Sequence, residues 1–301
     1  MNQEDNKEEI NKTKNHKNGV IKYKIFEKNF IKIGKYILNN YTISNYSQSQ
    51  NQVLKSRSSI IDWLYIISLT LNDSTLTFFN SIQIFDLFLS KNELLIQSEE
   101  IQLYSAVCYF ISKKFNEVIM LSIPFVSNKL LKGKFSKEEV SKTEINILRK
   151  LNFNINIDTV QSYSLCYYKI LIEKFSEDAD LIYETNTGIN IFSLQVVDLL
   201  FECSPFSISF ITYICSIKLI FFFEIIDSNK VKNLLLELKN ILNEDVFNEL
   251  YSKYYESSCS LFEIIKIKKD WLKNKPYFKS FFQLVNSNKD NDENNENEES
   301  E

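Results

Sequence analysis

The stretch Arg57-Ser58-Ser59-Ile60-Ile61-Asp62-Trp63-Leu64 sets an arginine against a helical pattern of apolar residues. The pattern continues over about 55–71 and consists of Ile60, Trp63, Leu64, Ile67 and Leu71. Arg57 falls at the phase where such a helix buries its side chains, and a buried charge is costly unless it is paired. The chain has 35 basic residues and only two are arginines. An arginine in place of the usual lysine at position 57 indicates that its partner requires the planar, forked donors of a guanidinium group.

Three more charged residues lie at buried phases of predicted helices. Asp86 lies in Ile84-Phe85-Asp86-Leu87-Phe88-Leu89-Ser90, Lys114 shares a helical face with Leu103, and Glu144 lies in Thr143-Glu144-Ile145-Asn146-Ile147-Leu148. Single charges of this kind usually lie at helix ends or solvated edges. Four of them within about ninety residues predict ion pairs or an interface with another protein.

The composition predicts an all-α protein. Only four glycines and three prolines occur in 301 residues, and 44% of the residues are hydrophobic, which suits long helices around a real core. Caps and helical periodicity predict helices at 20–40, 55–71, 75–90, 99–115, a short one opened by Pro124, 137–151, 159–175, 189–203, 206–223, 229–242, 244–256 and 259–274. The predicted helices of the second half repeat the five-helix pattern of the first half.

We therefore expect two tandem five-helix domains with flanking helices. The predicted parts are a disordered leader at 1–19, a helical segment at 20–49, domains at 50–157 and 158–275, and a disordered tail at 286–301. Subtracting the tail's charge of −6 from the chain's −4 leaves about +2 for the rest. Such a near-neutral body lacks the basic surface of a nucleic-acid binder, so we expect no nucleic acid.

Other residues argue against an enzyme, a metal site and a membrane protein. The glycines are isolated, the only histidine is His16 in the leader, and the five cysteines have no metal or redox spacing. We therefore expect no cofactor and no metal. The apolar stretch 206–223 contains Lys218, Thr212 and three serines, which favours a buried helix over a membrane span.

The charged residues and their neighbours resemble the cyclins, the regulatory subunits of cyclin-dependent kinases. The family's Met-Arg-Ala-Ile-Leu-Val-Asp-Trp-Leu is similar to 56–64, its Ile-Asp-Arg-Phe-Leu-Ser to 85–90, and its Ala-Ser-Lys-Phe-Glu-Glu to 112–117. The five hallmark positions of the cyclin box are matched by Arg57, Asp86, Leu103, Lys114 and Glu144. A weaker resemblance to the second box runs through 192–205.

The resemblance implies a non-catalytic protein that binds and activates a cyclin-dependent kinase and controls cell-cycle progression. It implies a kinase-binding surface formed by Ile111, Lys114, Phe115, Glu144, Leu148, Phe153 and Ile155. Lys114 and Glu144 would bond to the kinase backbone and, in the free subunit, to each other. Arg57 and Asp86 would form an internal, structural ion pair.

The resemblance also implies a groove that docks kinase substrates or inhibitors bearing Arg-x-Leu motifs. Its positions here are Ser56, Ser59, Ile60, Trp63, Ile66, Ile101 and Gln102. Serines replace a methionine at 56 and an isoleucine at 59, and Ile66 stands where the family usually has an acidic residue. We therefore expect a groove that is weaker or differently selective.

The alternative is a transcription-type cyclin or a cyclin-fold adaptor of the polymerase machinery, which would share Lys114 and Glu144. The helix with Arg57, Asp62, Trp63 and Leu64 favours the cell-cycle type. We expect the protein in the nucleus and cytoplasm.

Overall fold

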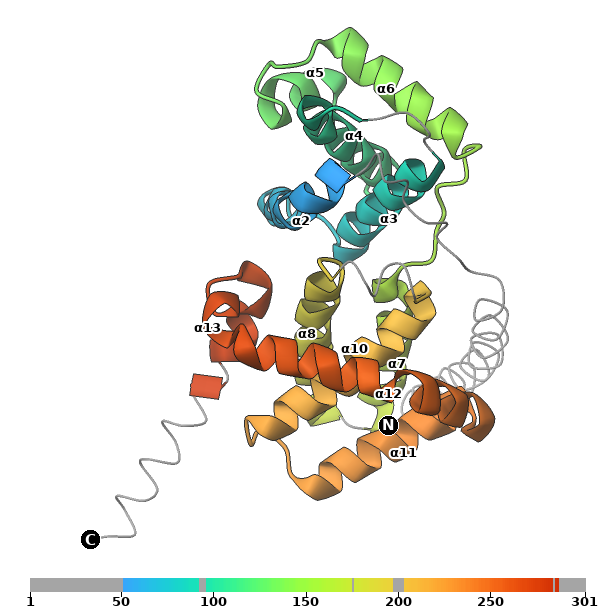
Figure 1. Cartoon of the computed structure of the whole chain (residues 1–301), viewed down its shortest axis with the longest axis vertical. Helices are drawn as coiled ribbons and strands as arrows, with labels where there is room; N and C mark the ends of the chain where they lie inside the picture. Colours follow the sequence, from blue (N-terminus) through green and yellow to red (C-terminus); the bar gives the residue numbers. More distant parts are fainter. Residues whose placement is uncertain (1–50, 92–95, 175, 197–202, 284, 287–301) are drawn as a thin grey trace, which may run out of the picture.

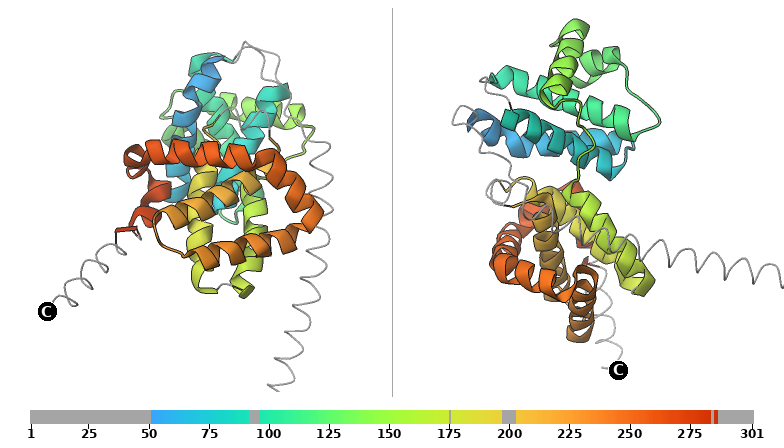
Figure 2. Two further views of the ribbon diagram at one scale, coloured as in Figure 1. Left: turned by 60° about the horizontal axis from the view of Figure 1, so that its bottom comes forward. Right: turned by 90° about the vertical axis from the view of Figure 1, so that its right-hand side faces the viewer.

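The computed structural model describes residues 51–91, 96–174, 176–196, 203–283 and 285–286, and these contain helices and no strand. The leader, the 20–49 segment and the tail beyond residue 286 lie outside the described residues. Figure 1 and Figure 2 show two stacked groups of helices, with blue-to-green residues in the first and yellow-to-red residues in the second. The prediction of an all-α fold is confirmed.

The first group is built around α4. It consists of α2 (Asn51–Thr70), α3 (Thr75–Lys91), α4 (Ser98–Asn116), α5 (Ile123–Phe125), the π-helical turn η2 (Val126–Leu130) and α6 (Lys137–Lys150). α4 packs against α2, α3, η2 and α6, and most of its residues from Ile101 to Lys113 are buried. α6 begins with a capping box, in which Ser136 Oγ accepts from the Glu139 amide at 3.1 Å while the Glu139 carboxylate accepts from the Ser136 amide at 2.7 Å.

The second group is built around α10. It consists of α7 (Val160–Lys174), α8 (Ser176–Ser193), α10 (Pro205–Phe222), α11 (Ser228–Leu242), α12 (Glu244–Ile267), α13 (Lys269–Leu272) and the 3-10 turn η3 (Pro276–Phe278). α10 packs against α7, α8, α11 and α12. By length and composition α10 is the one helix among the described residues that could cross a membrane, and 83% of it is buried. Burial in the bundle accounts for its apolar composition.

Three predicted helices of the second half have the wrong boundaries. The helix expected at 189–203 is α8, which begins at Ser176 and ends at Ser193. Gly188 lies inside α8, where a Cβ would approach the Tyr277 carbonyl oxygen to 2.5 Å, so this glycine permits close packing and does not end the helix. The helices expected at 244–256 and 259–274 are largely one helix, α12. Ser258 and Ser260 donate to carbonyls one turn back and are accommodated within it.

Candidate functional site

Lys114 and Glu144 form an ion pair on the surface of the first group. Lys114 is in the last turn of α4 and Glu144 is in α6, two helices that pack together. Lys114 Nζ donates to Glu144 Oε1 at 2.7 Å and lies 4.0 Å from the centre of the Phe110 ring. The side chains are 37% and 14% exposed. Both charges are therefore paired in the free chain, yet a partner can reach them.

Apolar residues accompany the pair at the end of α4, in α6 and in the chain after α6. Phe115 follows Lys114 and is 48% exposed, while Phe153 is 67% exposed; Leu148 and Ile155 are partly buried. We call Lys114, Phe115, Glu144, Leu148, Phe153 and Ile155 the Lys114–Glu144 surface. Ile111, expected on its rim, is only 2% exposed, because its side of α4 faces the core. It supports the surface from beneath and does not offer a contact.

The backbone after α6 holds Phe153 out towards solvent. Asn152 and Phe153 both have a left-handed backbone, with φ of 51° and 58°. The Phe153 amide donates to the Leu148 carbonyl at 2.8 Å, which closes the end of the helix. A bulky aromatic residue rarely adopts this conformation, and such strained residues gather at functional sites. The exposed phenyl ring on a strained backbone makes this end of α6 a candidate for a binding surface.

Arg57 and Asp86 are paired inside the protein. Their side chains are 2% and 1% exposed, and Arg57 Nη2 donates to Asp86 Oδ2 at 2.9 Å while Nη1 donates to Oδ1. Arg57 Nε also donates to the Leu194 carbonyl at 2.8 Å. The guanidinium fork thus joins α2, α3 and the chain just after α8. The contact with Leu194 crosses 137 residues and has no signal in the local sequence.

The seven groove positions lie on the neighbouring helices α2 and α4. Ser59 and Ile66 are exposed, and Ser56, Trp63 and Gln102 are partly exposed. Ile60 and Ile101 are 7% and 4% exposed, so they belong mainly to the core and offer little surface to a peptide. The accessible part of the predicted groove is therefore smaller than expected.

A buried charge cluster between α4 and the connection from α2 to α3 was not predicted. Asp73 accepts from Lys113 Nζ and from the Tyr109 hydroxyl, and Lys113 is 3% exposed. Burial raises the pKa of the Tyr109 hydroxyl, and the hydrogen bond to Asp73 and the negative charge of Asp73 raise it further. The Asp73 carboxylate points to α4 and not to the first turn of α3. The partners lie 36 to 40 residues apart, so only packing could bring them together.

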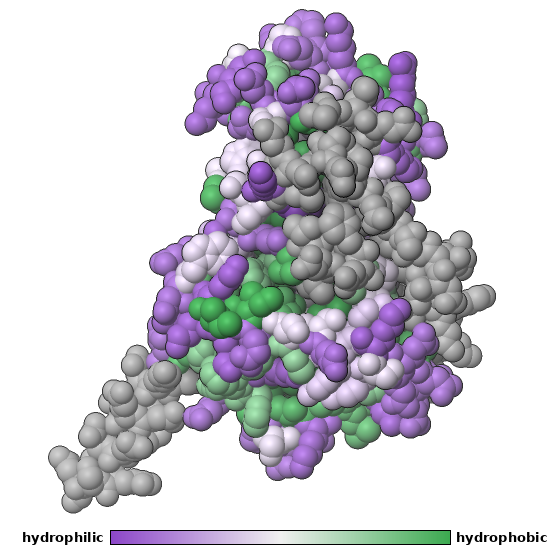
Figure 3. Space-filling model, in the orientation of Figure 1, coloured by the Kyte–Doolittle hydropathy of each residue, from purple (hydrophilic) through white to green (hydrophobic). Residues whose placement is uncertain are grey.

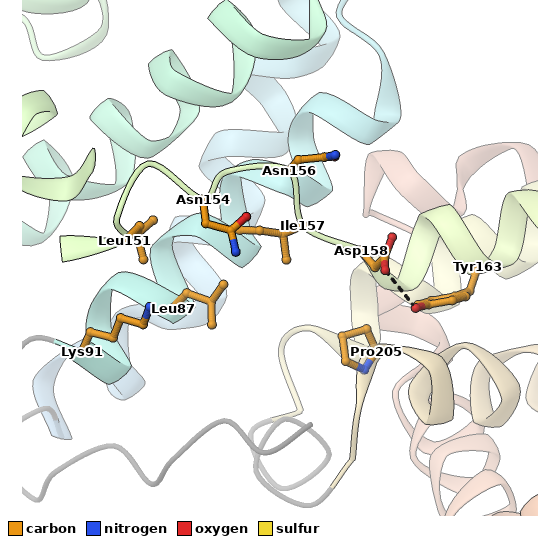
Figure 4. Close-up of a pocket in the computed structure, with 9 residues that line it drawn as sticks. All are labelled: Leu87, Lys91, Leu151, Asn154, Asn156, Ile157, Asp158, Tyr163 and Pro205. Carbon is orange, nitrogen blue, oxygen red and sulfur yellow. Dashed lines mark hydrogen bonds between the residues drawn. The ribbon is translucent and has the colours of Figure 1, made fainter. Parts of the chain in front are cut away.

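A small hollow lies beside the connection between the two groups (Figure 4). Its volume is about 300 Å³, and it is lined by Leu87, Lys91, Leu151, Asn154, Asn156, Ile157, Asp158, Tyr163 and Pro205. Tyr163 donates to Asp158 Oδ2 at 3.3 Å. Among the described residues, no group of three or more His, Cys, Asp or Glu side chains could hold a metal ion.

Comparison with known families finds the cyclin N-terminal domain at residues 28–156. Two proteins of Saccharomyces cerevisiae are each 31% identical to this chain: the G2/mitotic-specific cyclin-2 over 102 residues and the S-phase entry cyclin-6 over 103. The alignments cover 34% of this chain and 20% and 26% of the yeast proteins. The matched part is thus about a fifth to a quarter of the length of these relatives.

Solved structures share the fold at low sequence identity. A viral cyclin from herpesvirus saimiri matches with a TM-score of 0.55 and 15% identity, over 75% of this chain and 88% of the viral one. A chain of the CAK complex from Chaetomium thermophilum bound to ATP-γ-S matches with a TM-score of 0.54 and 14% identity, over 86% and 77%. Residues 28–156 of this chain therefore match the cyclin N-terminal domain, and the described chain has the fold of these solved structures.

Proposed function

We propose that this chain is a cell-cycle cyclin, a non-catalytic subunit that binds and activates a cyclin-dependent protein kinase. The observation that carries the proposal is the Lys114–Glu144 pair, a reachable ion pair flanked by the exposed rings of Phe115 and Phe153. A few desolvated charges beside aromatic anchors are what an interface hot spot requires. The similarity to two yeast cell-cycle cyclins supports the cell-cycle type.

The surface supplies two kinds of contact to a kinase. Lys114 offers donors and Glu144 offers acceptors to backbone groups of the kinase's mobile helix, and Phe115 and Phe153 bury apolar area against it. Held inward by these contacts, the helix brings its glutamate to the kinase lysine that positions the ATP phosphates. The free energy of cyclin binding thus offsets part of the free energy that the kinase needs to adopt its active conformation.

The rigidity of the first group suits it to this task. Arg57 and Asp86 tie α2 to α3, and Lys113, next to Lys114 in the chain, ties α4 to Asp73 in the connection between α2 and α3. Buried, hydrogen-bonded pairs of this kind fix one arrangement of helices. A surface that does not rearrange on binding loses less entropy, so more of its contact energy is available to move the kinase helix.

The test is activation of a purified kinase. The full chain is mixed with each member of a panel of purified cyclin-dependent kinases, including one from budding yeast, and phosphorylation of a histone-type peptide and of a polymerase-tail peptide is measured. We expect the chain to bind at least one kinase and raise its rate on the histone-type peptide. Activation towards the polymerase peptide alone would favour the transcription type, and absence of binding to every kinase would refute the proposal.

Two further parts of the proposal concern substrates and location. We propose that kinase substrates or inhibitors dock weakly at the exposed parts of the α2–α4 groove, around Trp63 and Ile66. We also propose that the protein occurs in the nucleus and the cytoplasm, which microscopy of a fluorescently tagged chain would test.

A further inference from the structure

Lys218 is the one charged residue of α10, and its hydrogen-bond partner is a cysteine of α12. Lys218 Nζ donates to Cys259 Sγ at 2.8 Å, and both side chains are partly exposed. α12 packs against α10 and crosses in front of it in Figure 1. The same part of the surface in Figure 3 mixes hydrophilic and hydrophobic side chains. A small polar solute can therefore reach the sulfur of Cys259.

A second contact fixes the position of the lysine nitrogen. Lys218 Nζ lies 3.8 Å from the centre of the Tyr255 ring, which is one turn before Cys259 on the same face of α12. Tyr255 in turn stacks on Tyr251, with ring centres 4.6 Å apart. The ring and the sulfur together hold the nitrogen in contact with Sγ. Two groups held at contact distance react as in an intramolecular reaction, which raises the rate strongly.

Cys166 supplies a contrast within the same chain. It is also partly exposed, but its thiol donates to the Ser162 carbonyl at 3.2 Å and must therefore be protonated. Burial raises the pKa of Cys166 to about 11. The thiolate is the nucleophilic form of cysteine, and a neighbouring lysine ammonium favours it. Cys259 thus has the surroundings of a reactive cysteine, and Cys166 those of an inert one.

We propose that Lys218 and Cys259 are a modification site at which hydrogen peroxide forms a reversible covalent link between α10 and α12. The link is a sulfenamide, in which Nζ is bonded directly to Sγ. The proposal does not depend on kinase binding, because both residues lie in the second group of helices.

The reaction has three steps. The Cys259 thiolate attacks one oxygen of the peroxide, the O–O bond breaks, and a sulfenic acid and a hydroxide ion form. The hydroxide takes a proton from the Lys218 ammonium and becomes water, which leaves a neutral amine. The nitrogen lone pair then attacks Sγ; the S–N bond forms, the S–O bond breaks, and the hydroxyl leaves as a second water with a proton from nitrogen. Sulfur is oxidised by two electrons, and the peroxide is reduced to water.

The geometry favours the displacement step. Because Nζ already occupies one side of Sγ, the peroxide oxygen adds on the opposite side. The new S–O bond then points away from the lysine, so the amine lies in line with the leaving hydroxyl. Displacement at sulfur, as in thiol–disulfide exchange, uses an attack opposite the leaving group. The same exchange makes the link reversible, since a thiol can attack Sγ and release the lysine amine.

The first test is peptide mass spectrometry of the full chain after treatment with dilute hydrogen peroxide. Remaining thiols are blocked, and the chain is digested with trypsin without reductant. We expect a cross-linked peptide that contains Lys218 and Cys259, lacks two hydrogens relative to the separate peptides and is split by a thiol reductant. Cys259 that is unchanged, carries only added oxygen or forms a disulfide with another cysteine would overturn the proposal. A cross-link that retains one oxygen would overturn the displacement step.

Variants separate the chemistry from the fold. In Lys218→Arg a guanidinium keeps the charge and the donors beside Sγ but is not a nucleophile at neutral pH. Oxidation of Cys259 should then stop at the sulfenic acid, which dimedone would trap, and circular dichroism would confirm that the helices are retained. Cys259→Ser should give no cross-link. A cross-linked peptide of unchanged yield in either variant would overturn the assignment, and the wild-type measurement holds whether or not a variant folds.

Two further measurements use the untreated and the linked wild type. Cys259 should react with iodoacetamide at least about tenfold faster than Cys166, and equal rates would contradict the reactivity assigned to Cys259. The linked residues are 41 positions apart, so the link restricts the unfolded chain. Peroxide treatment should therefore raise the melting temperature by about 5 °C, and a thiol reductant should reverse the rise. A fully linked chain with a lower melting temperature would show that the native contact does not accommodate the bond.

Discussion

Lys275, just before η3, and Asp62 of α2 form an ion pair across 213 residues of sequence. Gln195 Nε2 donates to Asp62 Oδ1 at 3.0 Å and to the Tyr277 hydroxyl at 3.1 Å, so the pair belongs to a polar network. The ring of Tyr277 also packs edge-on against Tyr65, with centroids 5.6 Å apart. The C-terminal segment is thereby fastened to the first helix group.

Lys275→Ala should lower the free energy of unfolding by about 1–2 kcal/mol, because Asp62 would lose a charged partner at a site where the side chains are only 18% and 24% exposed. The matched control is Lys273→Ala, whose partner Asp270 is 81% exposed, and it should cost less than about 1 kcal/mol. Urea denaturation of both variants would measure the difference. Equal costs would mean that the Asp62 network does not hold the two groups together.

Arg57→Ala should destabilise the protein by about 3–5 kcal/mol, because it leaves Asp86 buried and without its main partner. The chain's other arginine supplies the control, since Arg149 is exposed and Arg149→Ala should change the free energy of unfolding by less than about 0.5 kcal/mol. Thermal melting followed by circular dichroism would compare them. Arg57→Lys should recover only part of the loss, since an ammonium group cannot serve Asp86 and the Leu194 carbonyl with the same fork.

Lys114→Ala and Glu144→Ala should each weaken kinase binding by about 2–5 kcal/mol, because each leaves kinase groups desolvated and unpaired. Lys114 is 37% exposed and can be hydrated when Glu144 is removed, whereas Glu144 is 14% exposed, so the melting temperature should change little in Glu144→Ala and fall slightly in Lys114→Ala. The neighbouring Lys113→Ala is the contrast: Lys113 is buried with Asp73, so that variant should melt at a lower temperature. Isothermal titration with the kinase, paired with thermal melting, separates the two effects; unfolding of the Lys114 variant would assign Lys114 to the core.

Arg-x-Leu peptides should bind this chain at least about tenfold more weakly than they bind a typical A-type cyclin. Ser56 and Ser59 have lost apolar area worth about 25 cal/mol per Å², and Ile66 offers no charge to the peptide's arginine. Since Ile66 is 52% exposed, Leu-x-Leu peptides should be preferred. Fluorescence anisotropy with both peptides, and with Trp63→Ala as control, would decide it. Tight binding that depends on the arginine would contradict the prediction.

The stability should fall with rising pH above about 8.5. Burial raises the pKa of Cys166 from its ordinary value of 9.0 to about 11, and burial also raises the pKa values of Cys108 and Cys215. In the unfolded chain these thiols ionise near their ordinary value, so between about pH 8.5 and about pH 10 the unfolded state releases protons that the folded state retains. The free energy of unfolding must therefore decrease, as urea titrations across this range would measure. Cys215→Ala should flatten the decrease.

The helices, their caps and the buried-phase charges were predictable from the sequence because each depends on neighbours within one or two turns. The periodicity around Trp63, the capping box at Ser136 and the cap at Ser204 all have this local cause. The same periodicity singled out Arg57, Asp86, Lys114 and Glu144 as charges that need partners. The helix boundaries predicted in the second half were wrong: α8 runs through Gly188, where the Tyr277 carbonyl leaves no room for a Cβ, and α12 continues through Ser258 and Ser260.

Tertiary structure alone decided which partners these residues have and which side chains remain exposed. Arg57 reaches the Leu194 carbonyl and Asp62 reaches Lys275 across 137 and 213 residues, distances over which sequence spacing carries no information. Burial was equally undetermined: Ile111 and Phe115 are both apolar residues near the end of α4, yet one is 2% exposed and the other 48%. The reason is physical, because helical phase fixes the face on which a residue lies, whereas the packing of other helices determines whether that face is covered.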